Sequence, residues 1–184
     1  MAKADVRTGN AKDDDDEEDG ARPAEKNYIT RAGHRRLTEE FDFLRNKKRP
    51  EVVGALADAA AEGDRSENAE YIYRKRQLRQ IDSRLRFLSK RLDVVQIVAP
   101  ESQARRDRIF FGATVTVEDE DGGSATYRIV GVDEVNADEG DISWQSPVGR
   151  SLLGKTVGDV VTVRWHAGLR ELTVAEIEYL AEKR

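Results

Sequence analysis

The sequence predicts an α+β fold, in which an N-terminal antiparallel α-helical coiled-coil hairpin precedes a C-terminal domain built on an antiparallel sheet. Apolar residues repeat with heptad spacing up to residue 95, and short runs rich in β-branched and aromatic residues begin after Pro100. Composition agrees, because 36% of the 184 residues are charged and only 38% are hydrophobic. Ordinary globular chains contain about 25% charged and about 45–50% apolar residues, so long exposed helices or a tail are expected.

Residues 1–27 are of low complexity, and the run from Asp13 to Asp19 contains only Asp and Glu. Like charges repel one another and the segment has little apolar surface to bury, so we expect a disordered acidic tail. Such a tail can mimic nucleic acid or bind a basic partner. The simpler interpretation, a solvated tail without a specific partner, is favoured.

Residues 28–97 are expected to form the hairpin. Thr30 is a suitable N-cap for its first helix, in which three apolar residues recur at spacings of four and three: Leu37, Phe41 and Leu44. Pro50 is not tolerated in the interior of a regular helix. Either one helix bends near Arg49, or a second segment starts there and ends at Gly63.

The second helix of the hairpin, expected from Ser66 to Asp93, has the clearest pattern. Seven apolar residues step by seven, three, four, three, four and three positions: Tyr71, Leu78, Ile81, Leu85, Leu88, Leu92 and Val95. This heptad seam needs a partner helix to cover it, and an antiparallel partner with its turn near Gly63 and Asp64 satisfies that need. The helix would be roughly 40 Å long at about 1.5 Å per residue.

Residues 98–184 are expected to form the sheet domain. Six runs favour strands, with glycine-containing turns at 121–123 and 139–141: 109–111, 114–117, 127–132, 142–144, 160–165 and 172–177. A short helix is expected at 149–153. Trp144 and Trp165 are interpreted as packing residues rather than as ligand-stacking platforms.

Composition also excludes several kinds of site. The chain has no cysteine, so disulfides, thiolate zinc sites and a cysteine nucleophile are excluded. His34 and His166 are too far apart in sequence to suggest a metal site. No apolar run approaches the roughly 18–20 residues that cross a bilayer, and the N-terminus has no apolar signal segment. We therefore expect a cytoplasmic protein without membrane contact.

Charge is distributed unevenly along the hairpin. The net charge is −5, yet residues 31–57 and 71–93 together carry fifteen basic and six acidic groups. Residues 58–70 carry one basic and five acidic groups. The sequence therefore predicts a basic stem that leads to an acidic tip at residues 62–71.

Two interpretations of the tip acids remain open. Asp64 lies three residues before Glu67, which is the spacing of a helix capping box. That role does not account for the further acids at the same end, where like charges repel. Carboxylates on a projecting end also suit Mg²⁺, which proteins bind through one or two carboxylates and which takes part in phosphoryl chemistry.

Two separated motifs resemble one protein family. The stretch from Gly63 to Tyr71, and Ser146-Pro147 followed by Leu152-Leu153-Gly154-Lys155 and Gly158-Asp159, resemble the Gre transcript-cleavage factors of bacterial RNA polymerase. The resemblance covers about residues 28–180. Three further stretches look more like the B type of the family, GreB, than the A type: Arg65–Glu67, Tyr71–Tyr73 and Arg84–Leu88.

The resemblance implies a fold and a mechanism. The C-terminal domain would have an FKBP-like fold, without implied prolyl isomerase activity, and would dock at the rim of the polymerase secondary channel while the hairpin enters the channel. Asp64 and Glu67 match the family's two functional acids and would share the second catalytic Mg²⁺ of the polymerase, bound only in the complex. Asn68, Glu70 and Tyr71 would support the tip.

The implied reaction is hydrolysis of a phosphodiester in backtracked nascent RNA, which rescues arrested elongation complexes. The protein would not itself be an enzyme, because it would supply acidic residues to the polymerase's own site. The implied partners are RNA polymerase and the 3′ end of the nascent RNA, with only indirect contact to the DNA of the transcription complex. A monomer is expected.

The basic stem is a candidate surface for RNA or polymerase, since phosphates attract such a surface without regard to sequence. Its eight candidate residues are Arg45, Lys48, Arg49, Arg74, Lys75, Arg76, Arg79 and Arg86. A solvated helix face is the alternative. Residues 71–93 hold eight basic and only two acidic residues, which favours a binding surface.

Two other functions stay open. A Gre-like factor that occupies the channel can regulate or inhibit the polymerase without stimulating cleavage, although the presence of both Asp64 and Glu67 argues against this. A coiled-coil interaction protein with an FKBP-like chaperone domain would instead show holdase or isomerase activity and no affinity for polymerase.

Overall fold

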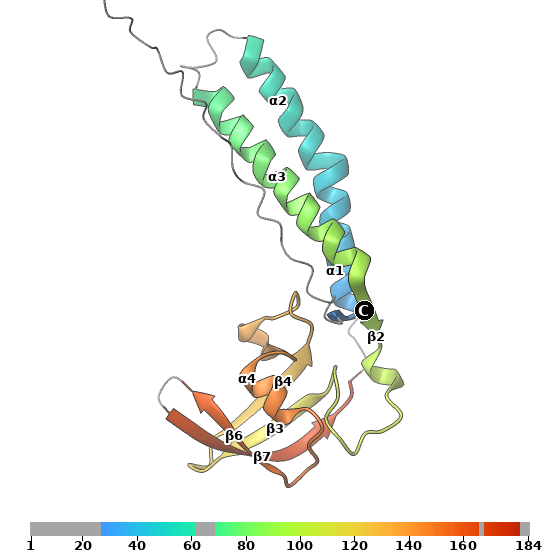
Figure 1. Ribbon diagram of the computed structural model, residues 1–184, viewed down its shortest axis with the longest axis vertical. Helices are drawn as coiled ribbons and strands as arrows, with labels where there is room; N and C mark the ends of the chain where they lie inside the picture. Colours follow the sequence, from blue (N-terminus) through green and yellow to red (C-terminus); the bar gives the residue numbers. More distant parts are fainter. Residues whose placement is uncertain (1–26, 62–68, 166–167, 181–184) are drawn as a thin grey trace, which may run out of the picture.

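The structure is a computed structural model that describes residues 27–61, 69–165 and 168–180, without the side chain of Trp165. It confirms the predicted fold class, because a helical hairpin projects from a curled sheet domain (Figure 1). The predicted acidic tail up to residue 26 and the predicted hairpin turn at 62–68 lie outside the described residues. His166 does as well.

The hairpin consists of two helical arms, with one short strand before the first arm and one after the second. In chain order its elements are β1 (Asn27–Thr30), α1 (Arg31–Phe43), the π-helix η1 (Leu44–Lys48), α2 (Arg49–Ala61), α3 (Ala69–Val94) and β2 (Val95–Val98). Thr30 caps α1 as predicted, and its hydroxyl accepts a hydrogen bond of 3.0 Å from the backbone N–H of Gly33. The first arm runs without a break from α1 to α2, and α3 returns beside it (Figure 1).

At Pro50 the continuous helix is the interpretation that the structure supports. The π-helix η1 lies just before it, and the backbone N–H of Arg49 donates to the carbonyl oxygen of Leu44, five residues earlier. Proline has no N–H, and its ring displaces the carbonyl group four residues before it. A π turn shifts the hydrogen-bond pattern by one residue, so the chain passes the proline without ending the helix.

The heptad seam of α3 faces the other arm, as predicted. Ile81 and Leu88 are buried, and the other seam residues are half-buried. The first arm contributes buried residues to the same face: Leu37, Val52 and Ala59. A fully buried Val or Leu side chain contributes about 1.5–3 kcal/mol relative to an exposed one, so apolar packing along the seam holds the two arms together.

The base of the hairpin contains a parallel strand pair that sequence reasoning did not predict. β1 pairs with β2 in a register from Asn27 opposite Val95 to Thr30 opposite Val98. Asn27 is buried, so the predicted end of the tail is one residue too late. Val95 begins a strand instead of continuing the helix. Four residues are too few to produce a clear alternation of apolar and polar side chains.

The C-terminal domain is a five-stranded sheet in the order β5-β4-β3-β7-β6. Its elements are η2 (Pro100–Ser102), β3 (Thr114–Asp119), β4 (Ser124–Val130), η3 (Ala137–Glu139), β5 (Asp141–Ser143), α4 (Pro147–Leu152), β6 (Val160–Trp165) and β7 (Gly168–Glu178). The sheet is antiparallel, as predicted, except at one edge, where β4 and β5 are parallel. The connection at 131–140 carries the chain back beside Arg128 before β5 begins.

The run 109–111, predicted as a strand, is not one. Ile109 instead exchanges backbone hydrogen bonds with the loop after α4, donating to the carbonyl of Lys155 (2.8 Å) and accepting from the N–H of Gly154 (2.7 Å). Gly112 then turns the chain with a φ of 85°, a left-handed conformation that favours glycine. The apolar side chain of Ile109 is buried, so the run serves the core without joining the sheet.

The domain core lies between the sheet and α4, the helix predicted at 149–153. Its buried residues are Ile109, Ala113, Val115, Val117, Ile129, Leu152, Val161, Val163, Leu172, Val174 and Tyr179. Trp144 is partly buried and packs against this core, in agreement with its interpretation as a packing residue. Its ring also contacts Tyr28 of β1, with 5.6 Å between the ring centroids. The side chain of Trp165 lies outside the described parts.

Tyr179 joins the end of the chain to the segment before β3. Its hydroxyl donates a hydrogen bond of 2.6 Å to the carbonyl of Arg108 and accepts one of 2.8 Å from the backbone N–H of Phe110. Burial raises the pKa of the Tyr179 hydroxyl. An acid whose pKa is raised by folding contributes stability below the pKa of the unfolded chain and loses it as the pH rises.

We therefore expect the folded protein to lose stability above about pH 10, the ordinary pKa of tyrosine, more steeply than the variant Tyr179→Phe. Thermal unfolding at a series of pH values measures this. Tyr73→Phe is the control, because Tyr73 is 57% exposed and its loss should leave the alkaline slope unchanged. Equal slopes in the wild type and Tyr179→Phe would contradict the prediction.

Candidate functional site

The predicted acidic tip lies only partly within the described structure. Asp64, Glu67 and Asn68 lie outside the described residues. The helix ends that flank them, Ala61 of α2 and Ala69 of α3, lie at the end of the hairpin remote from the sheet domain (Figure 1). The hairpin therefore carries both ends of the segment 62–68 away from the sheet domain.

The two predicted tip residues that are described, Glu70 and Tyr71, belong to the first turn of α3. Glu70 is 53% exposed and accepts a hydrogen bond of 2.7 Å from Nε of Arg74. Tyr71 is half-buried, and the ammonium of Lys75 lies 5.9 Å from its ring centroid. The charge of Glu70 is thus already compensated by a neighbouring cation, and Tyr71 is packed at the seam.

Five of the eight predicted stem cations have partners within the chain, and one of the five is Lys75, which lies beside the ring of Tyr71. Lys48 forms an ion pair with Glu51 (3.1 Å), and Arg74 forms one with Glu70. Arg49 forms an ion pair with Asp82 of α3 (2.8 Å). The guanidinium of Arg45 lies 5.9 Å from the ring centroid of Phe41. We call Arg45, Lys48, Arg49 and Arg74 the paired cations, since their charges are directed towards groups of the hairpin itself.

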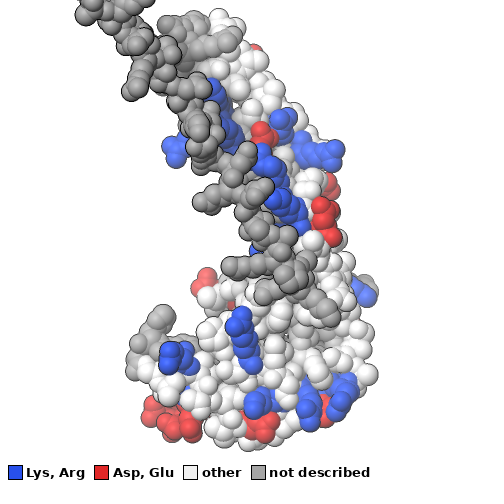
Figure 2. All heavy atoms as spheres, viewed as in Figure 1, with Lys and Arg blue, Asp and Glu red and all other residues white. Residues whose placement is uncertain are grey.

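What we call the basic strip consists of the three remaining candidates together with Lys90, which was not among the eight: Arg76, Arg79, Arg86 and Lys90. All are exposed, and within the described ranges none of them forms an ion pair. With Ile72 and Ser83 they step along α3 by four, three, four, three and four positions, so they share one helix face beside the seam. Figure 2 shows Lys and Arg side chains lined up along the hairpin.

Arg84 was not among the eight candidates, and the structure shows that it has a structural role. Its guanidinium donates two hydrogen bonds to the carboxylate of Glu40 on the first arm, of 2.7 and 2.8 Å. These hydrogen bonds lower the pKa of Glu40 and raise that of Arg84. Arg84 therefore connects the two arms and is not available to a ligand in the way that the basic strip is.

The end of the basic strip nearer the tip borders an open groove of about 510 Å³, lined by Ile72, Arg76, Arg79, Gln80 and Ser83. Ile72 is 54% exposed and the neighbouring Tyr73 is 57% exposed. Cations beside exposed apolar and aromatic surface suit a single strand of nucleic acid, whose phosphates and bases need both. Sequence reasoning missed Ile72, Gln80 and Ser83, although the position of Ile72 outside the seam was a signal.

No cluster of three or more His, Asp or Glu side chains suited to a metal ion occurs in the described parts of the chain. The shortest ion pair among the described residues of the sheet domain joins Arg128 and the buried Asp141, with hydrogen bonds of 2.7 and 2.6 Å that raise the pKa of Arg128. It connects β4 to β5 and is structural. Among the described helices, none is long and apolar enough to cross a membrane.

Comparison with protein families identifies two matches that together cover most of the chain. A model described as "Transcription elongation factor, N-terminal" matches residues 27–97. A second, described as "Transcription elongation factor, GreA/GreB, C-term", matches residues 92–179.

Two relatives found by sequence agree with these matches. Transcription elongation factor GreB of Haemophilus influenzae is 51% identical over 156 residues, which are 85% of this chain and 98% of the relative. GreB of Pseudomonas aeruginosa is 52% identical over 151 residues, 82% of this chain and 89% of the relative. A crystal structure of GreA factor homolog 1 from Thermus thermophilus matches 84% of this chain and 99% of its own, with 27% identity and a TM-score of 0.39.

Proposed function

Since the chain belongs to the GreA/GreB family of transcription elongation factors, we propose that it enters the secondary channel of RNA polymerase and stimulates hydrolytic cleavage of backtracked nascent RNA. The observation that best supports this proposal is the basic strip. Four exposed cations without ion-pair partners in the described part of the chain follow one face of α3 towards the tip. A face that is only solvated would be expected to mix charges of both signs, whereas the positions of this face from Ile72 to Lys90 hold no acidic residue.

The basic strip would hold the RNA that is extruded when the polymerase moves backwards. Each phosphate that a Lys or Arg neutralises releases a counterion, which gives affinity without sequence preference. The groove at Ile72 and the exposed ring of Tyr73 add apolar surface against which bases can stack. The strip leads towards the segment 62–68, so RNA held on it would be directed to the tip.

Asp64 and Glu67 would act at the tip as ligands of the polymerase's second Mg²⁺. The donor chemistry fits, because carboxylates are hard oxygen ligands and Mg²⁺ is usually bound through one or two of them. When bound, the ion activates water and stabilises charge in the phosphoryl transition state. Glu70 is less suited to this role, since Arg74 already compensates its charge. Asn68 and Tyr71 would then support the position of RNA.

The polymerase remains the enzyme in this proposal, and the present chain completes its site. The sheet domain would dock at the rim of the channel, and the hairpin would span the distance to the active centre. The first arm, from Arg31 to Ala61, is roughly 45 Å long at about 1.5 Å per residue. A monomer in the cytoplasm, where the transcription machinery of a bacterium lies, would be the acting form.

The test is to add the full chain to a backtracked elongation complex that carries 3′-labelled RNA, in the presence of Mg²⁺. We expect short labelled fragments to be released much faster than in the complex alone. Binding to the polymerase without release would reject the cleavage function and favour a factor that occupies the channel. Absence of binding, together with holdase activity, would favour a chaperone.

A further inference from the structure

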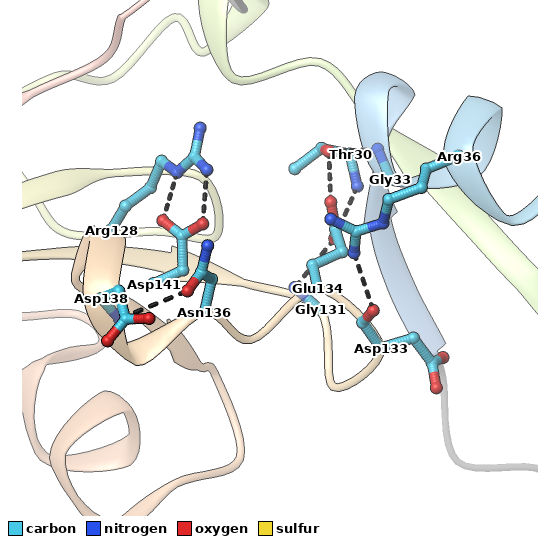
Figure 3. A network of polar contacts seen from close by, with 10 residues as sticks. All are labelled: Thr30, Gly33, Arg36, Arg128, Gly131, Asp133, Glu134, Asn136, Asp138 and Asp141. Carbon is cyan, nitrogen blue, oxygen red and sulfur yellow. Dashed lines mark hydrogen bonds and ion pairs between the residues drawn. The ribbon is translucent and has the colours of Figure 1, made fainter.

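The loop that follows β4 and contains Gly131, Asp133 and Glu134 forms polar contacts with the base of the hairpin (Figure 3). We call this set of contacts the joint. At its centre is Glu134, which is only 6% exposed. Its carboxylate accepts hydrogen bonds of 3.0 Å from the backbone N–H groups of Thr30 and Gly131, and a further hydrogen bond from the hydroxyl of Thr30. Three donors thus satisfy a buried charge that has no salt-bridge partner among the described residues.

Thr30 links this carboxylate to the first helix of the hairpin. Its hydroxyl donates to Glu134 and at the same time accepts from the backbone N–H of Gly33, in the first turn of α1. The N–H groups of a helix N-terminus carry partial positive charge and have no partner within the helix. A carboxylate of the sheet domain therefore completes the cap of a hairpin helix.

Two glycines allow this close approach. A Cβ atom at Gly33 would collide with the carboxylate of Glu134. A Cβ atom at Gly131 would lie 2.5 Å from the carbonyl oxygen of Tyr28, in β1. At Gly131 the collision is with backbone, so a larger residue would force the hairpin away from the loop. At Gly33 it is with the end of the Glu134 side chain, so a larger residue would displace that carboxylate from Thr30.

The neighbouring Asp133 contacts both arms of the hairpin. Its backbone carbonyl accepts a hydrogen bond of 2.9 Å from Arg36 of α1, and its carboxylate lies 3.5 Å from Nε of Arg91 in α3. The same carboxylate accepts a hydrogen bond of 3.3 Å from the side chain of Asn27. The loop therefore contacts three elements at the base of the hairpin, α1, α3 and β1.

We propose that Glu134 is a positioning residue which, through Thr30, fixes the direction in which the hairpin projects from the sheet domain. This inference rests on the proposed function, in which the sheet domain docks and the tip acts far away. A rotation of about 10° at the base would displace the end of a hairpin of roughly 45 Å by roughly 8 Å. Catalytic geometry tolerates far less, since a displacement of about 1 Å can cost about 100-fold in rate.

The direction of the hairpin can be measured without polymerase. Because the chain has no cysteine, Ala57→Cys on α2 and Glu120→Cys after β3 introduce the only two thiols for spin labels. We expect a narrow distribution of label distances in the otherwise unchanged chain, and a shifted or broadened one in Glu134→Gln and in Gly33→Ala. Alanine favours helix more than glycine does, so a change in Gly33→Ala does not reflect loss of α1.

Asp138→Asn is the matched control, because it removes the same charge from an exposed residue four positions away that lies outside the joint. Its distance distribution should equal that of the wild type. Unchanged distributions in both Glu134→Gln and Gly33→Ala would overturn the proposal. The label distances do not depend on whether the chain stimulates cleavage. A failure of the positioning proposal is therefore distinguishable from a failure of the proposed function.

A second measurement, of cleavage kinetics, distinguishes an effect on the direction of the hairpin from an effect on docking of the sheet domain to the polymerase. In the cleavage assay we expect Glu134→Gln to lower the maximal rate at least tenfold, while the concentration for half-saturation changes less than threefold. Thr30→Val should behave like Glu134→Gln, and Thr30→Ser, which keeps the hydroxyl, should restore the rate to near that of the wild type. A maximal rate unaffected by Glu134→Gln, or an equal loss in Thr30→Ser and Thr30→Val, would overturn the proposal.

Discussion

Replacing Asp64 by asparagine is expected to lower the rate of RNA cleavage in a backtracked complex by at least about 100-fold, while affinity for the polymerase changes little. Asparagine keeps the size of the side chain but loses the charge that a Mg²⁺ ligand needs. Removing one group that stabilises charge in a transition state commonly costs about 100–1,000-fold. Glu67→Gln should have a similar effect. Single-turnover cleavage at saturating factor measures both, and the Mg²⁺ concentration for half-maximal rate should rise.

Asp64→Asn also separates the two interpretations of the tip. Asparagine is as good an N-cap residue as aspartate, so the variant keeps a capping role while it removes a metal ligand. Wild-type cleavage by Asp64→Asn would therefore leave capping as the role of Asp64. Asp58→Asn is the charge-matched control on α2, where Asp58 is exposed, and its rate should stay within about threefold of the wild type.

The helical hairpin was predictable because its signal is local. The seam from Leu78 to Leu92 repeats every three or four residues, and the structure places these side chains against the first arm. The joint was not predictable in this way. Thr30 and Glu134 are 104 residues apart, and neither Glu134 nor Gly33 stands out by spacing or composition. Only the fold brings the two segments together.

In the candidate site, too, local features could be read from the sequence, and contacts between distant segments could not. The sequence identified the stem as basic, but it did not separate the free cations from the paired ones. For Arg49 and Arg84 the partners lie in the other arm, at Asp82 and Glu40, which are 33 and 44 residues away. Lys48 and Arg74 instead pair with acids of their own arm, at spacings of three and four residues that the sequence did show. Arg76, Arg79 and Arg86 were identified from charge alone, and their exposure on one face is a result of the structure.

Neutralising the basic strip is expected to remove most of the extra affinity that the factor has for a backtracked complex over one without extruded RNA. The variant carries Arg76→Gln, Arg79→Gln, Arg86→Gln and Lys90→Gln. Four phosphate contacts to a single strand give a salt slope of roughly −3 in log–log form. Between about 50 and about 200 mM salt, the wild type should therefore lose roughly 50-fold of this extra affinity, and the variant only a small part of that.

The paired cations provide a control that removes the same number of charges from the same hairpin. Neutralising Arg45, Lys48, Arg49 and Arg74 should reduce the salt slope by much less, because those charges already interact with Glu51, Asp82, Glu70 and the ring of Phe41. Titrating labelled factor against both complexes at several salt concentrations gives the two slopes. Equal losses in the two quadruple variants would mean that the stem attracts RNA through its total charge. A larger loss for the basic strip would mean that one face of α3 carries the RNA, because a general electrostatic field does not distinguish faces of a helix.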